Sequence, residues 1–266
     1  MSTRALRSAA SGMYAQQLNI ETISNNIANI NTTGFKKNRA EFKDLIYQEV
    51  SANPQNVDIQ GIVENPNSKV IVGTGVRPSS TEKVFKQGDL QETSQQLDIA
   101  IYGEGFFQMR KTDGTYAYTR DGSFKRSKDG SIVNSTGLVL EPGFTISDDT
   151  TEIAISRDGV ISTKSFSGDS VELGTLELAK FVNPGGLKAI GDNMYVETEY
   201  SGIPILGNAG TDGFGETHQG FLESSNVDIV EEMINMITAQ RSYEINSKTV
   251  QTVEQMMSIA NNIKRS

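Results

Sequence analysis

The chain lacks cysteine and tryptophan and has one histidine, His218, among its 266 residues. Without cysteine it can form no disulfide bond, no thiolate metal site and no cysteine nucleophile. One histidine cannot supply a histidine-based metal triad, and a Ser-His-Asp triad that used His218 would lack a Gly-x-Ser-x-Gly nucleophile motif. We therefore predict no catalytic residue, no metal site and no cofactor, and hence a protein that is not an enzyme.

Long hydrophobic runs are also missing from the sequence. No stretch approaches the roughly 20 apolar residues of a membrane-spanning helix, and residues 1–17 contain no apolar segment of the kind found in secretory signal peptides. The net charge of −9 disfavours binding to a phosphate backbone. We therefore expect no membrane insertion, no cleaved signal peptide and no nucleic-acid partner.

Helix-breaking residues are scarce at both ends of the chain. No proline occurs in residues 1–53 or 205–266, and 23 of the 25 glycines lie between Gly61 and Gly220. Both ends are therefore free to form long helices, whereas the middle is rich in turns. The middle, residues 54–221, also carries the whole net charge, with 14 Lys and Arg against 23 Asp and Glu.

The N-terminal end shows a heptad repeat of apolar residues. Such a repeat is typical of a helix with one apolar seam. It stops near residues 31–34, where Gly34 can adopt the positive φ of a helix C-terminus. The seam positions are Leu6, Met13, Ile20 and Ile27, each followed three residues later by Ala9, Gln16, Ile23 and Ile30.

The C-terminal end shows a longer repeat of the same kind. Asp228 and Glu231 are suitable for the start of a helix, and Lys264 and Arg265 for its end, because the helix dipole favours these charges there. The first set of seam positions is Ile229, Met236, Tyr243, Val250 and Met257. The second set is Met233, Gln240, Ser247, Val253 and Ala260.

The middle of the chain shows the pattern of β-strands. Asp-Gly pairs at residues 113–114, 121–122, 129–130 and 158–159 predict hairpin turns that need a positive φ. Residues 51–72 show no period and predict an extended connection. The expected strands cover residues 97–101, 106–110, 115–119, 153–156, 160–163, 173–181 and 194–198.

Together these patterns predict an α+β fold. We expect the long N- and C-terminal helices to form a coiled-coil-like core beside a mainly antiparallel β middle region. A two-helix pair leaves half of each apolar seam in water, so we expect the helices to become fully ordered only when they pack against other copies of the chain. The alternative interpretation is a single globular protein with a peripheral helical hairpin.

Two sequence runs resemble the signature of the flagellar rod and hook protein family. One run is residues 225–248, and residues 73–76, 103–107 and 118–124 also match in order. The resemblance covers nearly the whole chain. The other run has an asparagine-rich stretch followed by Thr-x-Gly-Phe, and its signature residues are Asn25, Asn26, Asn29, Thr32, Gly34 and Phe35.

The resemblance implies a fold of three parts. Residues 1–35 and 222–266 would form a terminal helical core domain, and residues 86–205 an outer β domain. Residues 36–85 and 206–221 would connect the two. A segment at residues 49–72 would stiffen the rod relative to the hook, although its amino-acid sequence departs here from that of the family's distal rod members. Representative residues of this segment are Glu49, Pro54, Ile59, Gly61, Pro66 and Val72.

The resemblance also implies a function. It indicates a subunit of the distal rod, the drive shaft of the bacterial flagellum, with a proximal rod or hook-like subunit as the alternative. The implied partners are further copies of the chain, proximal rod proteins, the hook protein, the P-ring and L-ring proteins and the flagellar type III export apparatus. The implied location is the periplasm-spanning rod of the basal body. A secreted adhesin, a glycosidase-like enzyme and a membrane-surface protein are the competing classes.

Overall fold

The computed structural model describes residues 2–51, 69–166 and 168–263, and these divide into two compact units. The helical unit comprises residues 1–25, 38–82 and 230–266, and the β unit comprises residues 26–37 and 83–229. Each end of the chain forms one long helix. These helices are α1 (Ser2–Ala28) and α2 (Ile229–Ile263).

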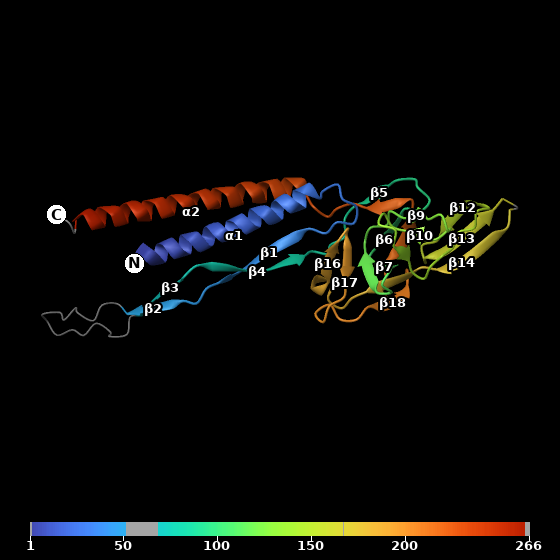
Figure 1. Cartoon of the computed structure of the whole chain (residues 1–266), viewed down its shortest axis with the longest axis horizontal. Coiled ribbons are helices and arrows are strands. Elements are labelled where there is room, and N and C mark those ends of the chain that lie inside the picture. The colour runs from blue at the N-terminus through green and yellow to red at the C-terminus, as the bar shows by residue number, and fades with distance from the viewer. Residues whose placement is uncertain (1, 52–68, 167, 264–266) are drawn as a thin grey trace. The chain divides into compact units, whose positions relative to one another are not determined.

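In the helical unit, α1 and α2 lie side by side, and two strands run along α1 (Figure 1). These strands are β1 (Asn38–Asp44) and β4 (Val76–Lys83), which pair with each other. A second pair, β2 (Gln48–Ser51) and β3 (Lys69–Val72), is antiparallel. The predicted helices are therefore present, whereas β1 and β4 were not predicted.

The prediction of a coiled-coil-like core was wrong, although the α+β class holds. Of the described residues of α2, only Glu232 and Ala239 are buried, and one of these is charged. Ile229 and Met233, two apolar residues of the predicted seam, are exposed. The large apolar side chains that are buried lie instead in the β-rich middle. Each helix has too few deeply buried side chains for knobs-into-holes packing with the other.

The largest element of the β unit is a nine-stranded sheet, in which β7 and β8 form the hairpin expected around Gly114. Along the sheet the order is β16-β17-β8-β7-β11-β10-β9, with β15 added beside β7 and β18 beside β15. The strand bounds are β7 (Phe106–Arg110), β8 (Tyr116–Thr119), β9 (Lys125–Arg126), β10 (Ile132–Val133), β11 (Val139–Leu140), β15 (Glu177–Lys180), β16 (Lys188–Gly191), β17 (Met194–Val196) and β18 (Ile205–Asn208).

Smaller sheets complete the β unit. A three-stranded antiparallel sheet has the order β12-β13-β14, and β6 pairs with β19 while β5 pairs with β20. The bounds are β5 (Leu90–Glu92), β6 (Ile99–Tyr102), β12 (Thr150–Ile155), β13 (Val160–Ser165), β14 (Ser170–Thr175), β19 (Glu216–Gln219) and β20 (Phe221–Glu223), with a 3-10 helix at Pro184–Gly186.

The predicted strands of the middle region are present with one difference, and the predicted turns also differ at one position. Residues 173–181 form parts of two strands, β14 and β15, because Leu176 between them turns into the core. Of the four glycines in the predicted hairpin turns, three adopt the expected positive φ, at Gly114, Gly130 and Gly159. Gly122 does not. A Cβ atom there would collide with the Ile99 carbonyl, so close backbone approach requires glycine at this position.

Two apolar clusters hold the β unit together. The larger contains Phe107, Leu140, Ile161 and Leu178 among others, all fully buried. The smaller is aromatic and contains Phe106, Tyr118, Phe181 and Tyr195 with Ala179 and Leu187. Its rings meet edge to face, as in the Tyr118 and Phe181 pair at 4.8 Å between centroids.

The buried tyrosines predict how stability changes at alkaline pH. Burial, aided by the charges of Glu197 and Tyr116, raises the pKa of Tyr118 to about 12, and burial also raises the pKa of Tyr195. Both groups keep their protons longer in the folded state, so their contribution to stability is complete below pH 10. The contribution of Tyr118 is lost as the pH rises from 10 through 12, and that of Tyr195 is lost at still higher pH.

Absorbance titration at the tyrosinate band tests this expectation, because the chain has eight tyrosines and no tryptophan. We expect two tyrosines to ionise only near or above pH 12 and to do so together with unfolding. In the Tyr118→Phe variant one of these late steps should be missing. Ionisation of all eight tyrosines near pH 10 in the folded chain would contradict this assignment.

Candidate functional site

Helix α1 presents its predicted seam to the rest of the helical unit. Ala9 and Ile23 are buried, and none of the seam residues from Leu6 to Ile23 is exposed. Gly12 faces α2, and a Cβ atom there would lie 2.9 Å from Asn246 Nδ2. The absence of a side chain at Gly12 therefore lets the two helices approach closely.

Helix α2 has three different sides. The side that faces inward carries Glu232, Met236, Ala239, Asn246, Val250, Val253 and Met257, all buried or half-buried. A second side is apolar but exposed, and its residues are Val230, Ile234, Ile237, Ile245, Met256, Ile259 and Ile263. We call this second set the outer apolar stripe. A third side is polar and exposed, with Gln240, Glu244, Gln251, Ser258 and Asn262.

The outer apolar stripe places more large apolar side chains on one side of a helix than an ordinary protein surface does. At 3.6 residues per turn its seven residues fall on one side of a helix of 35 residues, which spans about 52 Å. Each of the seven is more than half exposed, for example 63% at Ile245 and 70% at Ile263. Arg241, Lys248 and Thr252 lie on the same side, so the stripe consists of two apolar groups, at residues 230–245 and 256–263, and exposed apolar groups of this kind mark an interaction site.

The predicted seam of α2 coincides only partly with the inward side. Met236, Val250, Val253 and Met257 face inward as expected. In the first half of the helix the buried residues are Glu232 and Ala239, one position before the predicted Met233 and Gln240. The role of all seam residues as an assembly interface stays a prediction.

The predicted stiffness segment lies mostly outside the described residues. Pro54, Ile59, Gly61 and Pro66 fall among residues that the structure does not describe. Its two ends are paired with each other through β2 and β3, in which Gln48 lies opposite Val72 and Glu49 opposite Ile71.

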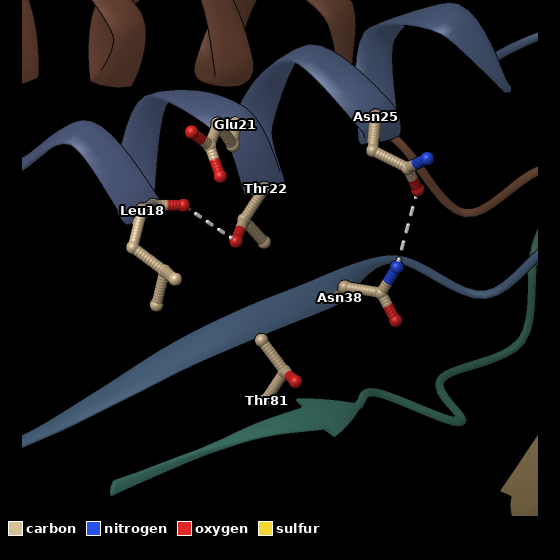
Figure 2. Close-up of a pocket in the computed structure, with 6 residues that line it drawn as sticks. All are labelled: Leu18, Glu21, Thr22, Asn25, Asn38 and Thr81. Carbon is tan, nitrogen blue, oxygen red and sulfur yellow. Dashed lines mark hydrogen bonds between the residues drawn. The ribbon is translucent and has the colours of Figure 1, made fainter. Parts of the chain in front are cut away.

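A cavity of about 350 Å³ lies between α1 and the strand pair β1–β4 (Figure 2). Its lining is mostly polar, and its one carboxylate, Glu21, accepts a hydrogen bond from Gln17 Nε2 at 3.1 Å. Asn25 lies at its edge and accepts a hydrogen bond from Asn38 Nδ2 at 3.3 Å (Figure 2). No pair of carboxylates lines this cavity, so it lacks an acid–base arrangement of the kind that glycoside hydrolysis needs.

The family signature forms a turn inside the β unit. Gly34 has φ +67° and donates its N–H to the Glu223 carbonyl at 2.7 Å. A Cβ atom at Gly34 would lie 2.7 Å from the Asp121 nitrogen, which explains the requirement for glycine. Phe35 is buried, and the Lys83 ammonium lies 4.9 Å from its ring centre. The signature therefore encodes packing of this turn.

The signature asparagines have partners within the chain. Asn26 is buried, and Asn29 Oδ1 accepts a hydrogen bond from the Thr32 hydroxyl at 3.1 Å. Together with the Asn25–Asn38 bond, these contacts favour local capping over the hypothesis that Asn25, Asn26 and Asn29 bind neighbouring subunits.

A buried ionic cluster follows the signature turn. Lys36 Nζ lies 2.6 Å from Glu223 Oε1, and both side chains are 1% exposed. Arg120 Nη1 lies 3.5 Å from Glu223 Oε2, and its guanidinium group is 5.3 Å from the Phe106 ring centre. Burial lowers the pKa of Lys36, the Glu223 carboxylate opposes this, and Arg120 adds to the lowering. The cluster therefore holds two cations against one carboxylate.

No pattern in the sequence predicted this cluster. Lys36, Arg120 and Glu223 are far apart in the chain and belong to no periodic pattern. The only available signal was that Lys36 follows the Gly-Phe pair of the signature directly. Charged residues are almost never fully buried unless they are paired, which sequence spacing alone does not reveal.

The described residues contain no group of three or more His, Cys, Asp or Glu side chains arranged to hold a metal ion. Among the described residues, neither helix is long and apolar enough to cross a membrane.

Comparison with known protein families gives three matches along the chain. Residues 6–36 match the model described as "Flagella basal body rod protein". Residues 100–163 match "Flagellar hook protein FlgE/F/G D1 domain", and residues 218–263 match "Flagellar basal body rod FlgEFG protein C-terminal". Both helices and a large part of the β unit are therefore covered.

Individual proteins match over almost the whole length. The flagellar basal-body rod protein FlgG of Borreliella burgdorferi is 48% identical over 98% of this chain and 99% of its own. FlgG of Caulobacter vibrioides is 44% identical over 98% of this chain and 99% of its own. The solved structure of the Helicobacter pylori hook protein FlgE2 matches weakly, with 16% identity over 71% of this chain and 43% of that chain and a TM-score of 0.24.

Proposed function

The chain belongs to the flagellar basal-body rod protein family and is a structural subunit of the distal rod, and we propose that it polymerises through the outer apolar stripe of α2. It is not an enzyme. The proposed product is a hollow helical tube that transmits motor torque to the hook. A head-to-tail contact that does not close on itself generates such a filament.

The outer apolar stripe is the observation that supports this mechanism. Each of its large apolar side chains would contribute roughly 1.5–3 kcal/mol if it were buried against a neighbour. The inward side of α2 already contacts α1 of the same chain, as at Asn246 and Gly12. The stripe therefore remains available for another copy. We propose that the predicted seam residues of α1 and α2 also take part in this interface.

In the basal body the chain assembles with other rod and hook components. We propose that its specific partners are the proximal rod proteins, the hook protein and the P-ring and L-ring proteins. We also propose that it crosses the periplasm after passage through the flagellar type III export apparatus, without a cleaved signal peptide. Export before assembly is consistent with helices that become fully covered only in the polymer.

The three-part division at residues 1–35 with 222–266, 36–85 with 206–221, and 86–205 remains our proposal for how the subunit is organised in the rod. We further propose that residues 49–72 stiffen the rod. The antiparallel pairing of β2 with β3 supports this role, because it gives the segment a fixed base in the helical unit.

Hydrogen exchange on the soluble subunit and on the polymer tests the proposed mechanism. In the soluble subunit we expect rapid exchange of amides in residues 2–30 and 230–263. In the polymer we expect protection of the same amides to rise about 100-fold or more, since burial of the stripe must stabilise the helices by at least roughly 2.7 kcal/mol.

Amides of β7 and β8 in the β unit provide the internal control, because they are buried in a nine-stranded sheet and should be protected in both samples. Full protection of both helices in dilute monomer, or failure of the purified subunit to form filaments at high concentration, would contradict the proposed mechanism.

A further inference from the structure

We propose that Lys36, Arg120, Glu223 and Asn226 form a polar clamp that positions the two terminal helices for assembly. This inference rests on the proposed function. The clamp lies entirely within the β unit, where residues 26–28 end α1 and Ile229 begins α2. It joins the turn that leaves α1 to the segment that leads into α2.

Glu223 is the centre of the clamp. Its Oε1 accepts hydrogen bonds from Lys36 Nζ at 2.6 Å and from the Gly88 N–H at 2.9 Å. Its Oε2 faces Arg120 Nη1 at 3.5 Å, and its backbone carbonyl accepts the Gly34 N–H at 2.7 Å. One residue near the start of α2 therefore binds the signature turn by both its side chain and its backbone.

Asn226 makes a second connection between the same two segments. Its Oδ1 accepts the Lys37 N–H at 2.8 Å, and its Nδ2 donates to the carbonyls of Val84 and Lys86 at 2.8 Å each. Lys36 Nζ also donates to the Lys86 carbonyl at 2.9 Å. Three chain segments, at residues 34–37, 84–88 and 223–226, are thus joined by directional bonds.

The composition of the clamp favours a positioning role over simple stabilisation. A buried ion pair is often no more stabilising than an apolar replacement, whereas its bonds have defined directions. Arg120 Nε is moreover the one buried side-chain nitrogen or oxygen, in the part of the chain that the structure describes, without a hydrogen-bond partner. A cluster with an excess cation and an unpaired donor is poorly suited to maximal stability, but it fixes one geometry.

The physical consequence concerns assembly. Lys36 and Glu223 are 187 residues apart in the sequence, so the clamp can close only when residues 34–37 and 223–226 have come together within the β unit. Once it is closed, the end of α1 and the start of α2 are held at one separation. The stripe of α2 can then meet a neighbouring copy in a single orientation, which a regular lattice requires.

The decisive variant is Lys36→Met, because it removes one of two buried cations and leaves the Arg120–Glu223 pair in place. We expect the β unit to remain folded, with the midpoint of thermal unfolding changed by only a few degrees. The critical concentration for polymerisation should rise about tenfold or more.

Asn226→Ala is the second variant. It removes the hydrogen bonds of the Asn226 side chain to residues 37, 84 and 86 and leaves the buried charges unchanged. A direct readout of positioning comes from two spin labels, introduced with Asn31→Cys and Ile229→Cys in a chain that has no other cysteine. We expect one narrow distance distribution with the clamp intact. The distribution should be broad in Lys36→Met and in Asn226→Ala.

Ile161→Val is the matched control, since it destabilises the larger apolar cluster without touching the clamp. If it impairs assembly as much as Lys36→Met at equal thermal stability, the clamp has no positioning role. The proposal is also overturned if both clamp variants keep a narrow distance distribution and polymerise normally. Failure of the unmodified chain itself to polymerise would instead count against the proposed function.

Discussion

Replacing Ile237 with aspartate is expected to abolish polymerisation while the subunit stays folded. Ile237 lies in the outer apolar stripe and is 51% exposed in the single chain, so the substitution removes little packing within the subunit. In the polymer the change would forfeit roughly 1.5–3 kcal/mol of apolar burial and would force a carboxylate out of water at a cost of several kcal/mol.

These costs determine the expected magnitude. Every 1.4 kcal/mol changes an association constant by a factor of ten, so a loss of about 3 kcal/mol or more raises the critical concentration at least 100-fold. Sedimentation of polymer from purified subunits measures that concentration. The motility of cells that carry the variant as their only copy measures the consequence for the rod.

Gln251→Asp provides the matched control on the same helix. Gln251 is exposed on the polar side of α2, so the variant adds the same charge away from the stripe. We expect its critical concentration to stay within about threefold of the unmodified chain, because exposed charges contribute little. If Ile237→Asp polymerises as readily as Gln251→Asp, the stripe is not the assembly surface.

The same helix shows why the sequence predicted some features and not others. Apolar spacing correctly placed Val250, Val253 and Met257 on the inward side of α2. It failed at Met233 because α2 is apolar on two sides, and a heptad pattern cannot decide which side faces the rest of its own chain. The single-chain structure separates the inward side from the outer apolar stripe, for which we propose a second set of neighbours.

The β unit was predictable for a different reason. Its hairpins depend on local rules, so the Asp-Gly pairs at Gly114 and Gly159 lie between paired strands as expected. The coiled-coil-like core was wrong because heptad spacing does not decide how deeply a helix packs, and of the described residues of α2 only Glu232 and Ala239 are buried. The ionic contact of Lys36 with Glu223 was not predicted, because it joins residues 187 positions apart that no local pattern relates.

Gly122→Ala is expected to be the most destabilising single substitution that adds only a methyl group to the β unit. The new Cβ would collide with the Ile99 carbonyl oxygen and lie 2.7 Å from the Ile99 carbonyl carbon. Both partners are backbone atoms of a buried strand edge, where the Ile99 N–H also donates to the Gly122 carbonyl at 3.1 Å. Neither of the two backbone segments can move away from the other without breaking this hydrogen bond.

We therefore expect Gly122→Ala to lower the free energy of unfolding by about 3 kcal/mol or more. For a unit of this size the thermal midpoint should fall by about 6–12 °C. Gly114→Ala is the matched control. Gly114 has φ +82° with no atom within 4 Å of a Cβ, so only backbone strain of about 1–2 kcal/mol is expected.

The comparison of the two glycine variants separates two reasons for which glycine occurs after aspartate in this chain. Denaturant unfolding of both variants should give the larger loss at Gly122, although its φ lies outside the left-handed region and that of Gly114 lies within it. Equal losses would mean that conformational freedom governs both positions and that the contact with Ile99 relaxes at little cost. A larger loss at Gly122 would show that an Asp-Gly pair can mark a close crossing of two backbone segments, as well as a hairpin turn. The β unit that carries the clamp would then depend on one such crossing, next to Arg120 and Asp121.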